Sequence, residues 1–247
     1  MEIARRIQAE NALRQANTEL QTRNKELDAF AHTVAHDLKN PLSIITSYGE
    51  ILSRVGLTMS PKELELIFGE VQKSARKATN IIEELLLLAS SRKEAVTIRS
   101  LNMEAIVAAA QARLTLMIQE SQAETLYPQH WPRSLGYGPW VEEVWVNYLS
   151  NGLKYGGVPP RLELGATRQE NDMIRFWVRD NGAGLSPQAQ ALLFTEFTRL
   201  DEIQTQGHGL GLSILRHIVK KLGGQVGVES NNIPRQGCTF YFTLAAG

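Results

Sequence analysis

The first forty residues constrain the fold most, because they contain no glycine or proline and carry a seven-residue apolar repeat. The repeated positions hold Leu13, Leu20, Leu27 and Val34, and the companion core positions hold Asn17, Asn24 and Ala31. A leucine seam with asparagine at facing positions is typical of a two-stranded coiled coil, in which asparagine fixes register and oligomeric state. The repeat therefore predicts one long helix and a parallel homodimer. An amphipathic helix that packs on its own chain remains the alternative.

The same helical pattern continues to about residue 54 and is followed by a turn over residues 55–59. Ser60, Pro61 and Glu63 then form a capping box with proline at the first helical position, and a second helix is expected to about Ser90. Two long helices joined by a short turn predict an antiparallel hairpin. One hairpin has too little core to stand alone, whereas two form a four-helix bundle, so the hairpin also favours a homodimer.

Charge and cysteine content exclude several classes of protein. Lys and Arg total 26, as do Asp and Glu, so no global field favours nucleic acid or an anionic membrane. Cys238 is the single cysteine and lies in a strand-like run, where we expect a small core residue. Apolar runs such as residues 85–89 are far shorter than the roughly 20 residues that span a bilayer. We expect a cytoplasmic protein without a membrane segment, and a fragment of a longer chain, because it begins inside a helical pattern.

The pattern changes near residue 95. Strands are expected at residues 96–98, 161–166, 173–178, 225–229 and 239–244, and helices at residues 101–120, 139–154, 187–193 and 210–222. This mixture of helices and mostly antiparallel strands predicts an α/β sandwich with helices on one face of a sheet. We therefore expect an α+β protein in which residues 1–94 form the coiled coil and helical hairpin and residues 95–247 form a second domain.

One candidate for chemistry is the helical segment from Phe30 to Leu42, where His36 and Asp37 are adjacent and Asn40 precedes Pro41. The histidine could accept a phosphoryl group on a ring nitrogen, and the carboxylate could orient the ring and take its proton. His32 is a weaker rival, because it precedes a threonine and lacks the Asn-Pro ending. A surface or core histidine without chemistry is the other interpretation.

The second candidate is the run from Asn147 to Tyr155. Asn147 and Asn151 are four residues apart and share a helical face, with Lys154 beside them. Amide oxygens suit Mg²⁺, which keeps most of its waters and bridges nucleotide phosphates. Lysine offers those phosphates a point charge. The alternative is a set of polar residues on a solvated helix face.

Two glycine-rich segments follow. Asp180 ends an apolar strand and precedes Gly182 and Gly184, so its carboxylate could accept a hydrogen bond from an exocyclic amine. Residues 207–213 open a helix with glycines at 207, 209 and 211, which lets backbone N–H groups approach phosphate oxygens. The polar stretch between them, beginning at residues 194–197, indicates a lid over a ligand. Alone, Asp-Asn-Gly is also an ordinary turn sequence, and a glycine-rich loop by itself does not specify a phosphate site.

Together and in this order, these segments resemble the boxes of the HisKA-type sensor histidine kinases, over nearly the whole chain. His36 to Pro41 resembles the phospho-acceptor box, Asn147 to Tyr155 the asparagine box, Asp180 to Gly184 and Gly207 to Gly211 the two glycine boxes, and Phe194 to Phe197 the phenylalanine box. The resemblance implies a dimerisation and histidine-phosphotransfer domain followed by a Bergerat-type ATP-binding domain, with ATP and Mg²⁺ as cofactors.

The resemblance also implies roles for individual residues. His36 would be the phospho-acceptor, Asp37 its acid/base partner, and Asn40 the residue that positions water when a partner is dephosphorylated. Asn151 would hold Mg²⁺ beside Asn147. The other residues implied to bind ATP are Lys154 at phosphate, Tyr155 in the nucleotide pocket, Asp180 at the adenine amino group, Gly182, Gly184, Phe197 and Leu210 around the pocket, and Gly207, Gly209 and Gly211 at the triphosphate.

The chain departs from the family pattern at three places. Gly152 replaces an alanine that is usual after the second asparagine, Gly138 lies where an aspartate is common, and residues 127–138 are rich in aromatic residues and proline. None of these removes a catalytic group, but that edge of the domain is expected to pack differently.

The implied function is Mg-ATP-dependent autophosphorylation of His36, on the same or the partner chain, then phosphotransfer to an aspartate of a separate response regulator, with phosphatase activity toward it. An upstream PAS, GAF or phytochrome-like sensor would control the core. One alternative is a GHKL-type ATPase, although those enzymes use glutamate where this chain has Asn147. Another is a non-catalytic nucleotide-binding scaffold.

Overall fold

The computed structural model describes residues 2–93, 96–194, 211–231, 233 and 236–247. The chain divides into two compact units, Met1–Glu83 and Glu84–Gly247, so the boundary between them lies inside the second long helix.

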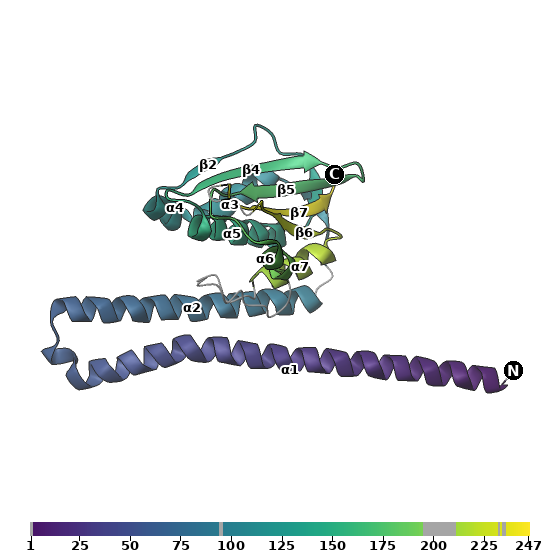
Figure 1. Cartoon of the computed structure of the whole chain (residues 1–247), viewed down its shortest axis with the longest axis horizontal. Coiled ribbons are helices and arrows are strands. Elements are labelled where there is room, and N and C mark those ends of the chain that lie inside the picture. The colour runs from purple at the N-terminus through teal and green to yellow at the C-terminus, as the bar shows by residue number, and fades with distance from the viewer. Residues whose placement is uncertain (1, 94–95, 195–210, 232, 234–235) are drawn as a thin grey trace. The chain divides into compact units, whose positions relative to one another are not determined.

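The first unit is a helical hairpin, as the sequence predicts. Helix α1 (Glu2–Val55) is followed by a short 3₁₀ turn, η1 (Gly56–Thr58), and by helix α2 (Pro61–Lys93), which runs antiparallel to α1 (Figure 1). Helix α1 continues without interruption through Pro41. The capping box also forms, because Glu63 N donates to Ser60 Oγ at 3.3 Å and Ser60 N donates to Glu63 Oε2 at 2.7 Å. The Ser60 hydroxyl also donates to Glu63 Oε2 at 2.7 Å, and this bond together with that from Ser60 N lowers the pKa of Glu63.

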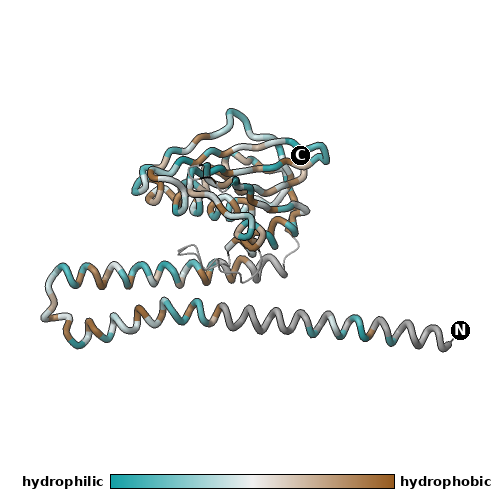
Figure 2. Tube along the Cα trace, in the orientation of Figure 1, coloured by the Kyte–Doolittle hydropathy of each residue, from teal (hydrophilic) through white to brown (hydrophobic). Residues whose placement is uncertain are grey.

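Each helix of the hairpin has one buried face. Among the described residues, those buried are Asp37 and Pro41 on α1 and Ile67, Ser74, Ala78 and Ile81 on α2, at spacings of three to seven residues. Hydrophobic residues recur along both helices at this helical spacing (Figure 2). Other apolar side chains on the same helices, among them Ile44 and Ile51, are exposed in the single chain. The side chains of Leu20, Asn24, Leu27 and Ala31 lie outside the described residues, whereas Leu13 and Asn17 are exposed.

The second unit is an α/β sandwich, which confirms the predicted α+β class. Its helices are α3 (Met103–Arg113), α4 (Thr115–Ser121), α5 (Gly138–Tyr155), α6 (Pro187–Leu192) and α7 (Gly211–Lys221). Its strands are β1 (Arg99–Leu101), β2 (Glu124–Leu126), β3 (Ser134–Gly136), β4 (Arg161–Arg168), β5 (Met173–Arg179), β6 (Val226–Glu229) and β7 (Thr239–Ala245). The helices α3, α5 and α7 lie on one side of the sheet (Figure 1).

The main sheet has five strands in the order β2-β4-β5-β7-β6, and β1 and β3 form a separate antiparallel pair. Within the main sheet, β2 pairs with β4 in parallel and the other neighbours are antiparallel. Burial alternates along β5, where Ile174, Phe176 and Val178 are buried. They join a core of aromatic residues in which Trp145 packs edge-on against Phe242.

Three details differ from the sequence prediction. The strand expected at residues 96–98 lies instead at 99–101, where it pairs with β3. The helix expected over residues 101–120 is divided into α3 and α4 at Leu114, which is buried and has φ −106°. Residues 123–137, where the sequence predicts an irregular stretch with one strand at most, contain the two strands β2 and β3, and Trp131 packs 5.5 Å from Trp145. The strands β1, β2 and β3 pair with distant segments, and pairing of this kind outweighs local propensity.

No helix within the described part of the chain is both long enough and apolar enough to cross a membrane.

Candidate active site

In the hairpin unit, His36 and Asp37 form a pair on α1. The imidazole is 59% exposed, whereas the Asp37 side chain is only 3% exposed, and His36 Nδ1 lies 3.2 Å from Asp37 Oδ1. A buried carboxylate at Nδ1 fixes the orientation of the ring and leaves Nε2 as the nitrogen for chemistry. Asn40 is exposed one helical turn later. His32 lies on the same helix, but its side chain is outside the described residues.

In the second unit, α5 carries the two asparagines. Asn151 Nδ2 donates to Asn147 Oδ1 at 3.0 Å, and both side chains are half-buried at the border between the core face and solvent. Lys154 is exposed one turn further on. The predicted cluster therefore forms on one helical face, and the bond between the amides leaves Asn151 Oδ1 available to a ligand.

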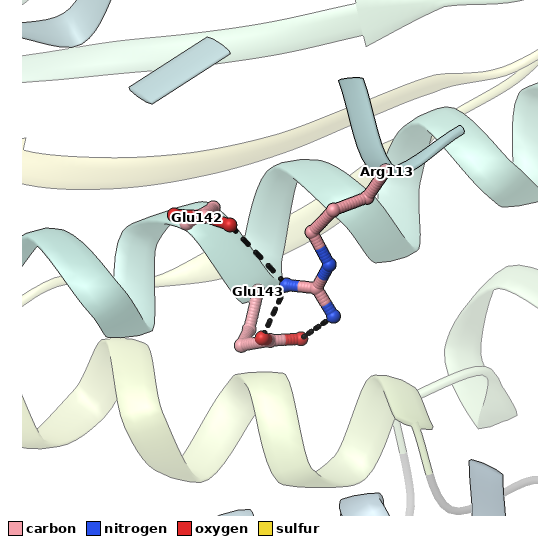
Figure 3. A network of polar contacts seen from close by, with 3 residues as sticks. All are labelled: Arg113, Glu142 and Glu143. Atoms are coloured by element: carbon pink, nitrogen blue, oxygen red, sulfur yellow. Dashed lines mark hydrogen bonds and ion pairs between the residues drawn. The ribbon is translucent and has the colours of Figure 1, made fainter. Parts of the chain in front are cut away.

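Helix α5 is held in place at both of its faces. On the core face, Tyr148 Oη donates to the carbonyl oxygen of Tyr241 at 3.0 Å, and burial raises the pKa of this hydroxyl so that it remains a donor. On the outer face, Arg113 of α3 binds Glu142 at 3.3 Å and Glu143 at 2.5 Å (Figure 3). These contacts fix the rotation of the helix and thus the direction of the asparagine pair.

At the end of β5, Asp180 is almost fully buried. Its Oδ1 accepts from the backbone N–H groups of Gly182 at 2.8 Å and Cys238 at 3.2 Å. Burial raises the pKa of the Asp180 carboxyl, although these two hydrogen bonds oppose that shift. Because both bonds reach Oδ1, the second carboxylate oxygen is left to accept from a ligand. Burial also raises the pKa of Cys238 to about 11, so its thiol behaves as the small core residue predicted.

Glycines around Asp180 allow close approach of the backbone. A Cβ at Gly182 would overlap the carbonyl oxygen of Tyr155, and Gly184 has φ +85°. Tyr155 is 38% exposed at the end of α5, and partial burial raises its pKa. Asp180, Gly182 and Tyr155 are thus brought together, as expected for residues that line one pocket.

Two residues of this region were not predicted from the sequence. Gly237 has φ +64°, and a Cβ there would overlap the backbone oxygen of Asp180. Asn181 accepts and donates hydrogen bonds across the turn that follows α5. In the sequence, Asn181 is visible only as part of an Asp-Asn-Gly turn, and nothing local indicates that Gly237 meets a strand more than fifty residues earlier.

Part of the predicted ATP site lies outside the described residues. This part comprises Phe197, Gly207, Gly209 and Leu210. Gly211 is the first residue of α7, which is consistent with a glycine-rich segment that opens a helix.

The described residues contain no group of three or more His, Cys, Asp or Glu that could hold a metal ion. The asparagine pair nevertheless fits Mg²⁺, because this ion prefers oxygen ligands and takes only one or two from protein while phosphates and water supply the rest.

Two protein-family models match this chain, one in its N-terminal part and one in its C-terminal part. Residues 26–94 match the model of the His Kinase A (phospho-acceptor) domain, and residues 136–247 match that of the histidine kinase-, DNA gyrase B-, and HSP90-like ATPases. The chain is 30% identical to the phytochrome-like protein Cph1 of Synechocystis over 95% of its length. It spans 31% of Cph1, so it corresponds to about a third of that relative.

Solved structures share the fold. Histidine kinase ThkA, solved in complex with the response regulator protein TrrA, superposes with a TM-score of 0.70 at 18% identity, covering 92% of this chain and 64% of that one. Full-length ShkA in complex with AMPPNP gives 0.60 at 19% identity, covering 88% and 46%. With a HisKA domain followed by the histidine kinase-type ATPase domain, the chain belongs to the HisKA-type sensor histidine kinases and corresponds to their catalytic core.

Proposed function

We propose that this core uses Mg-ATP to phosphorylate His36 and then passes the phosphoryl group to an aspartate of a separate response regulator. The observation that carries the proposal is the His36–Asp37 pair. An exposed imidazole with a buried carboxylate 3.2 Å from Nδ1 is arranged for attack through Nε2. The match of this segment to a phospho-acceptor domain supports the same assignment.

The proposed phosphoryl transfer forms one N–P bond and breaks one P–O bond. Nε2 of His36 attacks the γ-phosphorus as the bond to the β–γ bridging oxygen breaks, and ADP leaves with that electron pair. The Nδ1 proton of the resulting phospho-imidazolium passes to Asp37, which faces it. Transfer of this kind depends mainly on positioning and on neutralisation of the phosphate charge.

The nucleotide would bind in the second unit. Asp180 would accept from the adenine amino group, with Tyr155, Gly182 and Gly184 around the base. Asn151 would hold Mg²⁺ with Asn147 beside it, and Lys154 would meet phosphate; the metal would supply charge neutralisation. Phe197, Gly207, Gly209, Leu210 and Gly211 would complete the site. The ShkA complex with AMPPNP, a neighbour of this fold, supports a nucleotide in such a domain.

Partners follow from the same proposal. The ThkA complex with a response regulator supports a receiver protein as the phosphoryl acceptor. Asn40, one turn after His36, would position water when that acceptor is dephosphorylated. The likeness to a phytochrome-like protein supports a sensor domain upstream, and we place such a core in the cytoplasm as a homodimer with a boundary between its domains near residue 94.

The test is labelling with γ-labelled ATP and Mg²⁺ of the wild type, His36→Gln and His32→Gln. His32 is the matched control, because it is a histidine one helical turn earlier on the same helix. We expect acid-labile, base-stable label on the wild type and on His32→Gln. In His36→Gln we expect a loss of at least about a hundredfold, because the variant lacks the imidazole that pairs with the carboxylate.

Other outcomes would point elsewhere. Label that survives in His36→Gln and vanishes in His32→Gln would move the acceptor by one turn. Rapid release of phosphate by both variants without label on the protein would favour the ATPase. Nucleotide binding without either reaction would favour the signalling scaffold.

A further inference from the structure

The Asn181 side chain links the two walls of the proposed nucleotide pocket. Its Oδ1 accepts from the backbone N–H groups of Gly157 and Arg161, both at 2.8 Å, and its Nδ2 donates to the carbonyl oxygen of Pro159 at 3.1 Å. All three partners are backbone atoms at or beside the segment between α5 and β4. The single side-chain amide of Asn181 therefore hydrogen-bonds the backbone at the start, the middle and the end of that segment.

The fit around this amide is close. A Cβ at Gly157 would lie 2.6 Å from Asn181 Nδ2 and 2.9 Å from its Cγ, distances that real Cβ atoms do not adopt. On the other side of the turn, Gly182 leaves no room for a Cβ against the carbonyl oxygen of Tyr155. The segment after α5 and the turn after β5 are thus packed together at a separation that only glycine permits.

This contact joins residues with different proposed tasks. Asn181 directly follows Asp180, whose carboxylate faces the base, and the segment that it binds directly follows Lys154 and Tyr155 at the end of α5. We propose that Asn181 is a positioning residue that fixes the separation between the adenine wall at Asp180 and the wall formed by the end of α5. The inference rests on the proposed nucleotide site.

A purely structural role would have a different signature. If Asn181 only stabilised the domain, its loss would reduce the fraction of folded molecules, and the remaining molecules would bind with unchanged affinity. If it sets the separation of the walls, every folded molecule would bind a nucleotide that touches both walls more weakly. Calorimetry separates the two, because it reports stoichiometry and dissociation constant independently.

The matched control is Asn171. It lies two residues before β5, as Asn181 lies two residues after it, and its Oδ1 also accepts from a backbone N–H group, that of Met173 at 3.3 Å. Asn171 is exposed in the turn at the opposite end of the strand. Replacing it removes a comparable side chain without touching the proposed pocket.

The experiment titrates Mg-ADP into the full chain for the wild type, Asn181→Ala, Gly157→Ala and Asn171→Ala. We expect the dissociation constant to rise about tenfold in Asn181→Ala, because three hydrogen bonds that hold the segment are lost, at an unchanged stoichiometry. Gly157→Ala should give a rise of similar size, because its methyl group displaces the same amide. Asn171→Ala should bind like the wild type.

Two results would overturn the inference. One is wild-type affinity in Asn181→Ala. The other is a lower stoichiometry at unchanged affinity, which would assign Asn181 to stability alone. A wild type that does not bind Mg-ADP would instead contradict the proposed function, so the two failures are distinguishable.

Discussion

At the scale of single residues, Asp180 is a carboxyl group in a buried position that disfavours its charged form. Burial raises the pKa of this carboxyl, so ionisation at neutral pH costs the folded state free energy. A raised folded-state pKa contributes stability below the ordinary pKa of the carboxyl and loses that contribution as pH rises through the folded-state value. An ionised carboxylate at this position would therefore lower the stability of the folded state, which is typical of groups placed for a function.

Asp180→Asn should therefore separate stability from binding. The amide oxygen can still accept from Gly182 and Cys238, while the buried charge is removed. At pH 7 we expect the free energy of unfolding to exceed the wild-type value, because the variant has no carboxylate charge to bury. The difference should be smaller at pH 4, because the raised pKa of Asp180 lets the folded wild type take up a proton at this carboxyl as the pH falls. Denaturant unfolding at both pH values measures this.

Whereas the stability of Asp180→Asn should rise, its affinity for nucleotide should fall. The amide would face the adenine amino group with its N–H₂, so the affinity for Mg-ADP should fall at least about tenfold. Asp172→Asn is the control, because Asp172 is an aspartate at the exposed opposite end of β5. An Asp180→Asn variant that unfolds more easily at pH 7 than at pH 4, relative to the wild type, would contradict this account of the buried charge.

The same region shows which site residues can be predicted from the local sequence and which cannot. Asp180 is predictable because a carboxylate between a strand and glycines is visible within five residues. Asn181 and Gly237 are not, because their partners are distant in the chain: Asn181 binds backbone about twenty residues earlier, and Gly237 N donates to Gly182 O at 3.1 Å. Such contacts appear only when the sheet has brought β5 and β7 together.

At the scale of elements, helix α5 explains one departure from the family pattern. Gly152 lies inside the helix, where glycine costs roughly 1 kcal/mol relative to alanine. A Cβ at this position would meet Leu162 Cδ2 of β4 at 2.5 Å, and Leu162 is fully buried. The space that an alanine methyl group would occupy is therefore filled by the neighbouring strand.

Gly152→Ala alone should destabilise the domain. Overpacking a buried site costs about 1–3 kcal/mol, which exceeds the gain in helix propensity of roughly 1 kcal/mol. Leu162→Val alone should also destabilise, because it leaves a cavity. The double variant should recover most of both losses, so a double-mutant cycle should give a favourable coupling energy of about 1 kcal/mol or more. Urea unfolding provides the four free energies.

The control for helix propensity is Gly69, an exposed glycine inside α2. A Cβ there would meet no atom within 4 Å, so Gly69→Ala should raise the free energy of unfolding of the hairpin by up to about 1 kcal/mol. If Gly152→Ala raises the stability of its own domain in the same way, Leu162 can move aside at no cost, and the glycine in α5 has another cause.

Most elements can be predicted from the sequence because their signals are local. The capping box at Ser60 begins α2 where expected, and alternation predicts β4 and β5 with their connecting turn. The errors fall on short pieces whose partners are remote. Strand β1 exists because Leu101 pairs with Ser134, and α3 ends next to Leu114, whose side chain is buried. Neither pairing nor burial can be read from a window of about ten residues.

At the scale of the whole molecule, the hairpin leaves an apolar surface uncovered. Ile44, Ile51 and Val55 recur at spacings of seven and four residues on α1, which places them on one helical face, and all three are exposed. Phe68 and Ile82 of α2 are exposed as well. Exposed apolar residues that recur on one face of a helix favour an interface, and a second copy of the hairpin would complete a four-helix bundle.

The homodimer can be tested by charging that face. We expect the wild type to sediment as a dimer at micromolar concentration and Ile44→Glu/Ile51→Glu to sediment as a monomer, with a dimer dissociation constant raised at least about a hundredfold, because unpaired carboxylates would be buried. The control is Leu116→Glu/Leu192→Glu, which charges two exposed leucines of the second unit and should remain dimeric. Both variants should bind Mg-ADP normally, since neither replaces a residue of the proposed nucleotide site. A wild type that is monomeric throughout would contradict the homodimer, and a charged hairpin that still sediments as a dimer would place the interface at the leucine seam of residues 13–34 instead.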